Sequence, residues 1–180
     1  MPLPKKSEHT VKEIYMLPEG ARAELIDGEI YDMAPPNRIH QELVQQLSRI
    51  IGNYIVDHNG ECRVYPAPFA VFLNKDDRTY VEPDISVICD GDKLDENGCN
   101  GAPDWIIEIV SPGSQRMDYL TKLFKYRTAG VREYWIVNPM KQTVLVYSFG
   151  EKEDSTQYLF EDEIQVGIYP EFTIKISNFL

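Results

Sequence analysis

The sequence is short of positive charge and of long apolar runs, and each shortage argues against a class of protein. Its 180 residues carry 18 Lys and Arg against 29 Asp and Glu, a formal net charge of -11. A uniformly acidic surface repels nucleic acid and anionic membranes, which counts against a simple polyanion-binding protein without excluding local sites. No apolar run is long enough to cross a bilayer, and the first ten residues lack the apolar stretch of a signal peptide. We therefore expect a soluble, cytoplasmic protein with no membrane partner.

Cysteine is also scarce, with Cys62, Cys89 and Cys99 as the only three. No two of them have a zinc-type CxxC spacing. Cys89 lies in an apolar run and is expected to be a small buried side chain. The odd number and the spacing predict no disulfide framework and indicate a reducing compartment.

The chain does contain enough apolar residues for one core. Hydrophobic residues make up 43% and aromatic residues 11% of the sequence. That content and this length favour a single domain over 1–180. Neither an internal repeat nor a low-complexity segment interrupts it.

Helix and strand patterns alternate along the chain. A T-x-x-E capping box predicts a short helix over 10–17, and Asp27-Gly28 predicts the turn of a hairpin over 23–31. Apolar residues at helical spacing predict one long helix over 38–58 and another helix over 117–129. Strands are expected at 63–65, 69–73, 84–89, 105–110, 132–137 and 143–147, and a polar link at 150–157 before short terminal strands.

This order of elements predicts a single α+β or α/β sheet flanked by helices. The strand–helix–strand unit over 105–137 is expected to be a right-handed crossover that places its two strands parallel.

The helix over 117–129 carries two sets of side chains. One set is expected to form the inward stripe: Leu120, Leu123, Phe124 and Arg127. The other set, at i, i+4 and i+8, lies away from that stripe: Asp118, Lys122 and Tyr126. Asp118 and Lys122 could form an ordinary helical ion pair, or Lys122 could reach acids on the sheet.

One carboxylate interrupts the apolar run WIIEIV at 105–110. Because side chains alternate across a strand, Glu108 shares a face with Ile106 and Val110. An unpaired carboxylate there costs several kcal/mol, more than the roughly 2 kcal/mol gained by burying an aliphatic side chain. Glu108 therefore needs a partner, either a neighbouring Lys or Arg or a metal ion.

A second acid, Asp84, opens the preceding strand directly after Pro83. If the two strands are neighbours, Asp84 and Glu108 converge at one end of the sheet. Two close carboxylates repel each other, and a divalent cation is a common remedy. Pro-Asp on its own is a frequent turn sequence, so the pair is more informative than Asp84 alone.

Positive charge is concentrated in one part of the chain. Residues 111–141 carry six Lys and Arg against two acids, a local balance of +4. Such a segment could face phosphate or could be a solvated helix face.

These motifs, taken in order, resemble one large family. They are Ala23–Glu29, His40, Pro83-Asp84, Glu108–Ser114, Asp118, Lys122, Tyr126 and Gly130–Trp135. The set resembles the bacterial restriction-endonuclease-like family of unknown function within the PD-(D/E)xK nuclease superfamily. The resemblance runs from Thr10 to the C-terminal end.

The resemblance implies a restriction-endonuclease-like mixed β-sheet flanked by helices and metal-dependent cleavage of phosphodiester bonds. Asp84 matches the first acid and Glu108 the second. Val110 stands where the superfamily has its lysine, and the family places that lysine on the following helix, which implies Lys122, with Lys125 as the fallback.

By the same resemblance, Mg²⁺ or Mn²⁺ is the expected cofactor. Its expected ligands are Asp84, Glu108 and the Ile109 backbone carbonyl, and the expected supporting residues are His40, Glu24, Asp118 and Tyr126. For His40, a structural histidine is an equally good interpretation. The implied partner is nucleic acid, most naturally DNA, and a homodimer is an open arrangement because many nucleases pair to cut two strands.

Two other functions stay open. A non-catalytic binding module on the same scaffold would suit the charge of -11 and the lack of a DNA-reading motif. A metal-dependent hydrolase of another phosphoester is the third.

Overall fold

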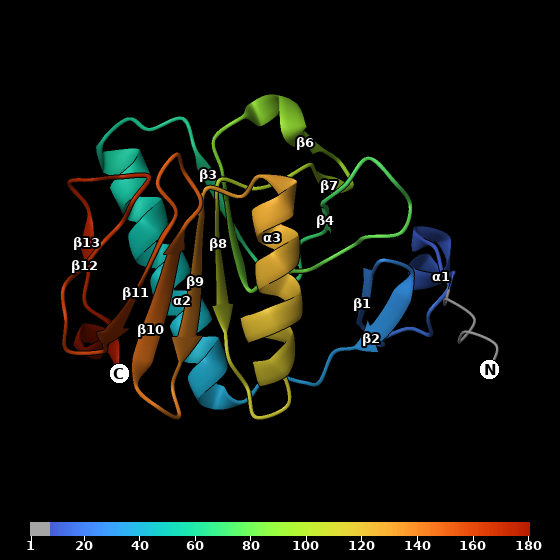
Figure 1. Ribbon diagram of the computed structural model, residues 1–180, viewed down its shortest axis with the longest axis horizontal. Helices are drawn as coiled ribbons and strands as arrows, with labels where there is room; N and C mark the ends of the chain where they lie inside the picture. The colour runs from blue at the N-terminus through green and yellow to red at the C-terminus, as the bar shows by residue number, and fades with distance from the viewer. Residues whose placement is uncertain (1–7) are drawn as a thin grey trace.

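A six-stranded mixed sheet with a long helix on each side forms the body of the molecule (Figure 1). The computed structural model describes residues 8–180. The expectation that the first ten residues are not a signal peptide falls mostly on residues 1–7, which lie outside the described residues. The strand order is β11-β10-β9-β8-β5-β3. The strands are β3 Arg63–Pro66, β5 Ile85–Ile88, β8 Trp105–Ile109, β9 Glu133–Asn138, β10 Thr143–Ser148 and β11 Asp154–Leu159.

The predicted parallel placement of the two crossover strands is confirmed. β8 and β9 are parallel neighbours, while β9 with β10 and β5 with β8 are antiparallel. The segment between β8 and β9 contains the π-helix η2, Met117–Lys122, and the helix α3, Leu123–Ala129. Gly130 ends α3 in the left-handed conformation with φ 98°, which a residue without Cβ adopts readily.

Each face of the sheet has its own apolar core. The helix α2, Arg38–Asp57, packs Leu43, Leu47 and Ile51 against Ile107 and Trp135 on one face. On the other face, α3 packs Tyr126 against the side of the sheet that carries Ile106 and Tyr134. Figure 1 shows α2 and α3 on opposite sides of the sheet. Glu108, between two α2-facing neighbours, therefore points to the α3 side.

The predicted N-terminal hairpin is also present, beside the main sheet (Figure 1). Strands β1, Ala23–Ile26, and β2, Glu29–Asp32, are joined by Asp27 and Gly28, whose φ angles of 52° and 82° fit a tight hairpin turn. The short helix α1, Val11–Tyr15, begins at a capping box in which the Thr10 N–H donates to Glu13 Oε2 at 2.8 Å.

Smaller elements complete the chain. A small three-stranded sheet is formed by β4 Val71–Phe72, β6 Leu94–Asp95 and β7 Gly98–Asn100, and the 3-10 turn η1 Gly91–Lys93 precedes β6. The C-terminal part contains β12 Ile164–Gln165, β13 Thr173–Ile174 and η3 Ile176–Phe179. Within residues 8–180, no helix combines the length and the apolar character that a membrane span requires.

The expected polar link at 150–157 is wrong from residue 154 onward, because β11 begins there as the outermost strand. Five of its six residues are exposed. An edge strand with both faces toward solvent needs no apolar alternation, so its sequence lacks the usual strand pattern.

The prediction that the cysteines stay unpaired is also wrong. Cys62 and Cys89 form a disulfide whose Cα atoms lie 3.8 Å apart. The antiparallel register of β3 and β5 pairs Arg63 with Ile88, so the next residues outward, Cys62 and Cys89, fall opposite each other. The inference of a reducing compartment loses its support, and Cys89 is half-buried and cross-linked rather than a free buried thiol.

Candidate active site

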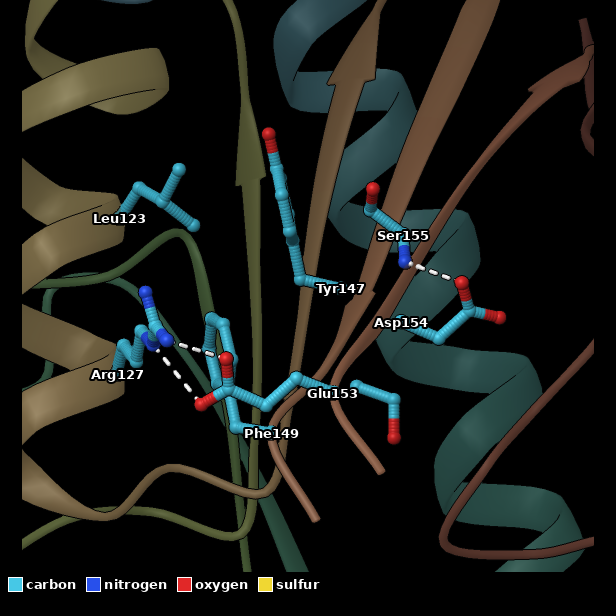
Figure 2. A pocket seen from close by; sticks show the side chains of 8 residues that line it. Leu123, Arg127, Tyr147, Phe149, Glu153, Asp154 and Ser155 are labelled. Carbon is cyan, nitrogen blue, oxygen red and sulfur yellow. Dashed lines mark hydrogen bonds and ion pairs between the residues drawn. The ribbon is translucent and has the colours of Figure 1, made fainter. Parts of the chain in front are cut away.

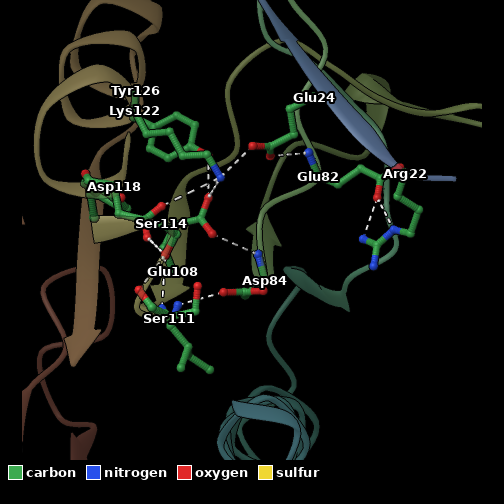
Figure 3. Close-up of polar contacts among 12 residues, drawn as sticks. Arg22, Glu24, Glu82, Asp84, Glu108, Ser111, Ser114, Asp118, Lys122 and Tyr126 are labelled. Carbon is green, nitrogen blue, oxygen red and sulfur yellow. Dashed lines mark hydrogen bonds and ion pairs between the residues drawn. The ribbon is translucent and has the colours of Figure 1, made fainter. Parts of the chain in front are cut away.

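Asp84 and Glu108 meet at one end of the sheet, as expected. The register pairs Ile85 with Ile107, which places Asp84 opposite Glu108 on the neighbouring strand. The Asp84 N–H points at Glu108 Oε2 at 3.4 Å, and Asp84 Oδ2 accepts from the Ile109 N–H at 2.7 Å (Figure 3). Ile109 is therefore beside Asp84, although its amide and not its carbonyl makes this contact.

Lys122 reaches the same place from the end of the π-helix. Its Nζ lies 2.9 Å from Glu108 Oε1, 2.9 Å from Glu24 Oε2 and 3.8 Å from Asp118 Oδ1. The Tyr126 hydroxyl donates to Glu108 Oε1 at 2.7 Å. Figure 3 shows Lys122 between carboxylates from three different elements.

The structure overturns most of the expected orientation of η2 and α3: of the expected inward stripe, Leu123 packs against the core, and Arg127 is exposed. Leu120 and Phe124 are each 62% exposed, whereas Asp118, Lys122 and Tyr126 are buried. Asp118, Lys122 and Tyr126 can face inward because they form hydrogen bonds and ion pairs with Glu108 on the sheet and with one another. Their buried polar groups are therefore satisfied. The wider turns of a π-helix also keep residues at i and i+4 on one side.

His40 approaches from the first turn of α2. Its Nε2 lies 3.1 Å from Asp84 Oδ2, and the helix begins at Asn37, whose side chain accepts from the His40 N–H. His40 Nδ1 is buried and has no hydrogen-bond partner within the described residues. Lys125, the alternative lysine, pairs instead with Asp27 of the hairpin turn and does not reach the acids.

Two further contributors could not be recognised as site residues from the sequence. The Ser114 hydroxyl donates to Asp118 Oδ2 at 2.5 Å, and the Glu82 N–H donates to Glu24 Oε1 at 2.9 Å. Ser114 is the last residue of the motif Glu108–Ser114, in the turn after β8, and Glu82 lies two residues before Asp84. Their proximity in the chain is the only signal, since neither residue type is unusual at these places.

Burial perturbs the titration of this cluster. Desolvation raises the pKa of Glu108 well above its usual range, with Lys122 opposing the rise, and it raises the pKa of Asp118 to about 6. Burial alone would lower the pKa of Lys122, but Glu108, Glu24 and Asp118 outweigh it and raise that pKa well above its usual range. These directions agree because one ammonium serves several carboxylates at once, so Lys122 stays charged while the acids compete for it.

The donor set fits a hard divalent cation. The cluster holds four carboxylates, those of Glu24, Asp84, Glu108 and Asp118, and one ammonium, that of Lys122, a net of -3 when all five groups are ionised and His40 is neutral. No three His, Cys, Asp or Glu side chains in residues 8–180 are grouped to hold a metal by themselves. Mg²⁺ commonly takes only one or two carboxylates and completes its shell with water and phosphate, which two acids and a main-chain carbonyl would suit.

Within this cluster, Asp84 and His40 have the side chains most exposed to solvent. Their exposed fractions are 13% and 12%, against 3–6% for Glu24, Glu108, Asp118 and Lys122. A substrate would therefore approach from the side of Asp84 and the first turn of α2.

A pocket of about 310 Å³ lies elsewhere, between α3 and the β10–β11 connection (Figure 2). Tyr147 and Phe149 line it, and Arg127 and Glu153 form an ion pair across it. Neither Lys122 nor any of the four acids borders this pocket. The candidate catalytic groups therefore lie in the buried cluster and not in this pocket.

Comparison with known proteins gives the family. Residues 11–177 match the model of the Uma2 family, described as "Putative restriction endonuclease". The chain belongs to this family. The resemblance seen in the sequence is thereby confirmed.

A solved structure shares the fold of this family member. It is described as a "putative nuclease belonging to DUF820" from Anabaena variabilis ATCC 29413 and superposes with a TM-score of 0.74 at 24% identity. The match covers 94% of this chain and 96% of that one. At this identity the likeness establishes the mixed sheet flanked by helices.

One curated relative matches over only part of its length. "Uncharacterized protein slr1290" from Synechocystis sp. (strain ATCC 27184 / PCC 6803 / Kazusa) is 25% identical over 125 residues, which are 69% of this chain. The matched region spans 60% of the length of that relative.

Proposed function

We propose that the protein is a metal-dependent endonuclease that hydrolyses phosphodiester bonds of nucleic acid, most naturally DNA. One observation carries the proposal: Asp84 and Glu108 stand opposite each other on β5 and β8, and Lys122 binds Glu108 from the next helix. Membership of a family described as "Putative restriction endonuclease" supports the same chemistry.

In this proposal each residue has a separate task. Asp84, Glu108 and the Ile109 carbonyl would hold Mg²⁺ or Mn²⁺. When bound, the cation lowers the pKa of a water molecule and offsets charge on the phosphate.

Lys122 would orient that water or donate to the phosphate oxygen that gains charge. His40 would keep Asp84 in place through its Nε2 contact.

The test is nicking of supercoiled plasmid with Mg²⁺ or Mn²⁺, and with EDTA as the blank. Wild type is expected to nick, and Asp84→Ala to lose at least about 100-fold of the rate because a charged ligand is gone. Asp104→Asn is the matched control, since Asp104 accepts the Cys89 N–H and pairs with Arg132 at the opposite end of β8. Equal nicking by wild type and Asp84→Ala, or no cleavage of any DNA or RNA form by wild type, would remove the proposal.

A non-catalytic binding module on the same scaffold is the second candidate. The position of Lys122 favours it, because carboxylates of Glu24, Glu108 and Asp118 surround the ammonium and leave it little freedom to serve a substrate. Titration calorimetry with Mn²⁺ separates the two. The nuclease requires binding that Asp84→Ala removes, and the binding module requires none at this place.

A further inference from the structure

The N-terminal hairpin sends one charged side chain into the catalytic cluster. The hairpin has a small core of its own, in which Ile14, Leu25 and Tyr80 pack together. Glu24 on β1 nevertheless points away from that core and is only 4% exposed. A buried carboxylate is costly unless it is paired, so its partners indicate what it is for.

Glu24 has partners on two different elements, one for each oxygen. Oε2 lies 2.9 Å from Lys122 Nζ, and Oε1 accepts the Glu82 N–H at 2.9 Å. Glu82 is two residues before Asp84, and its own carboxylate is held by the Arg22 guanidinium and the Tyr80 hydroxyl. Through Glu24, the lysine on η2 is tied to the segment that carries the first acid (Figure 3).

The position of the ammonium depends on this second anchor. Glu108 and Glu24 approach Lys122 Nζ at the same distance of 2.9 Å from β8 and β1, whereas Asp118 lies farther away at 3.8 Å. With Glu24 neutral, Glu108 would be the one close charge left, and a long lysine side chain held at one point can rotate about it. A displacement of about 1 Å at a reacting centre can cost on the order of 100-fold in rate.

We infer that Glu24 is a positioning residue: it holds the Lys122 amine where the reaction needs it, and the active site is incomplete without the N-terminal hairpin. This inference rests on the proposed nuclease function, with Lys122 as the group that meets the phosphate. Among the described contacts, the charged partner of Glu24 is Lys122, and its other partner is the Glu82 N–H.

The experiment compares two variants of the hairpin in the plasmid-nicking assay. Glu24→Gln keeps the shape and removes the charge, and we expect kcat to fall by about 10- to 100-fold while KM stays within about twofold, because substrate does not contact Glu24. Asp27→Asn is the matched control, since Asp27 binds Lys125 on the same helix one turn farther along. Its kcat is expected to stay within about twofold of wild type.

The outcomes distinguish an effect of the Glu24–Lys122 contact from an effect of docking the whole hairpin. A kcat loss confined to Glu24→Gln, with KM unchanged, supports the inference. Wild-type kcat in Glu24→Gln overturns it, and so does an equal loss in Asp27→Asn, which would show that docking of the whole hairpin matters rather than this contact. If Glu24→Gln does not fold, Glu24→Asp replaces it, since it keeps the charge and withdraws the carboxylate by one methylene; kcat must still fall, and an unchanged kcat overturns the inference.

A second measurement needs no catalysis. Urea unfolding of Glu24→Gln, Lys122→Met and the double variant forms a thermodynamic cycle, and the double variant is expected to lose less than the sum of the single losses. Additive losses would overturn the claim that Glu24 holds Lys122. If wild type cuts nothing while the cycle is non-additive, the proposed function fails and the Glu24–Lys122 contact stands.

Discussion

At the scale of single residues, the acid within the apolar run is explained by its partners. Glu108 accepts from Lys122 and Tyr126 on Oε1, and the Asp84 N–H points at Oε2. A buried carboxylate with one charged and one neutral donor is far less costly than an isolated one. Glu108 is therefore one of several buried residues whose polar groups form hydrogen bonds with groups on neighbouring elements.

Asp118 gives a prediction about pH. Burial raises its pKa from 3.8 to about 6. A carboxyl with a higher pKa in the folded state favours folding while protonated, so this contribution is present below about pH 4 and is lost as the pH rises to about 6. The free energy of unfolding should fall by up to about 3 kcal/mol over that interval, with the neutral Asp118→Asn lacking this part of the profile. Urea unfolding in EDTA at several pH values checks it, and parallel profiles for the two proteins would contradict it.

The positions of the two acids could be predicted from local sequence, whereas Lys122 was singled out by the family resemblance. Pro83 fixes the chain before Asp84, and Glu108 is conspicuous in its apolar surroundings. Glu24 was expected at the site only through the family resemblance, because nothing in a hairpin sequence indicates that one face of a strand turns toward a distant helix. Contacts between elements far apart in the chain depend on tertiary packing, which residue patterns do not encode directly.

At the scale of elements, the helix after β8 shows where pattern reading fails. Aliphatic periodicity predicted that Leu120 and Phe124 face the sheet, yet both are exposed. The rule that apolar stripes face inward leaves out polar partners on the sheet. The α3 side of the sheet carries Glu108 among its apolar residues, so the polar side of the helix is buried beside it, while Leu123 packs against the apolar part of that face.

Two substitutions on this helix test its orientation. Tyr126→Phe removes the hydroxyl that donates to Glu108 and should cost about 1–2 kcal/mol of the free energy of unfolding. Phe124→Ser alters a side chain that is 62% exposed and should change it by less than about 0.5 kcal/mol. Chemical denaturation measures both. The reverse order of costs would show that the apolar stripe faces the sheet after all.

Other elements followed the sequence closely, for local reasons. The long helix α2, the hairpin turn at Asp27-Gly28 and the crossover between β8 and β9 have strong signals in a few consecutive residues. The edge strand β11 has none, because solvent on both faces leaves its composition polar.

At the scale of the whole molecule, most of the local positive charge is neutralised. Of the six cations in residues 111–141, four pair with carboxylates: Lys122, Lys125, Arg127 and Arg132. The expected phosphate-facing patch on this segment is thereby reduced, and an acidic protein that binds nucleic acid would depend strongly on its metal. A homodimer, the preference for DNA and a cytoplasmic location stay predictions.

The cross-link between β3 and β5 gives a prediction about the whole fold. Cys62 and Cys89 are 27 residues apart, and closing a loop of that length stabilises the folded state by about 3.5 kcal/mol in the chain-entropy model. Reduction should lower the urea midpoint accordingly. Unfolded protein should show one reactive thiol without reductant, Cys99, and three with it. Three thiols in unreduced protein would show that the cross-link is absent.

The central claim is that Asp84 and Glu108 hold one divalent cation beside Lys122. Anomalous diffraction from crystals soaked in Mn²⁺ tests it most directly. We expect a single strong peak at about 2.0–2.4 Å from a carboxylate oxygen of each acid. Density that stays featureless between Asp84 and Glu108 at saturating Mn²⁺ would contradict the claim.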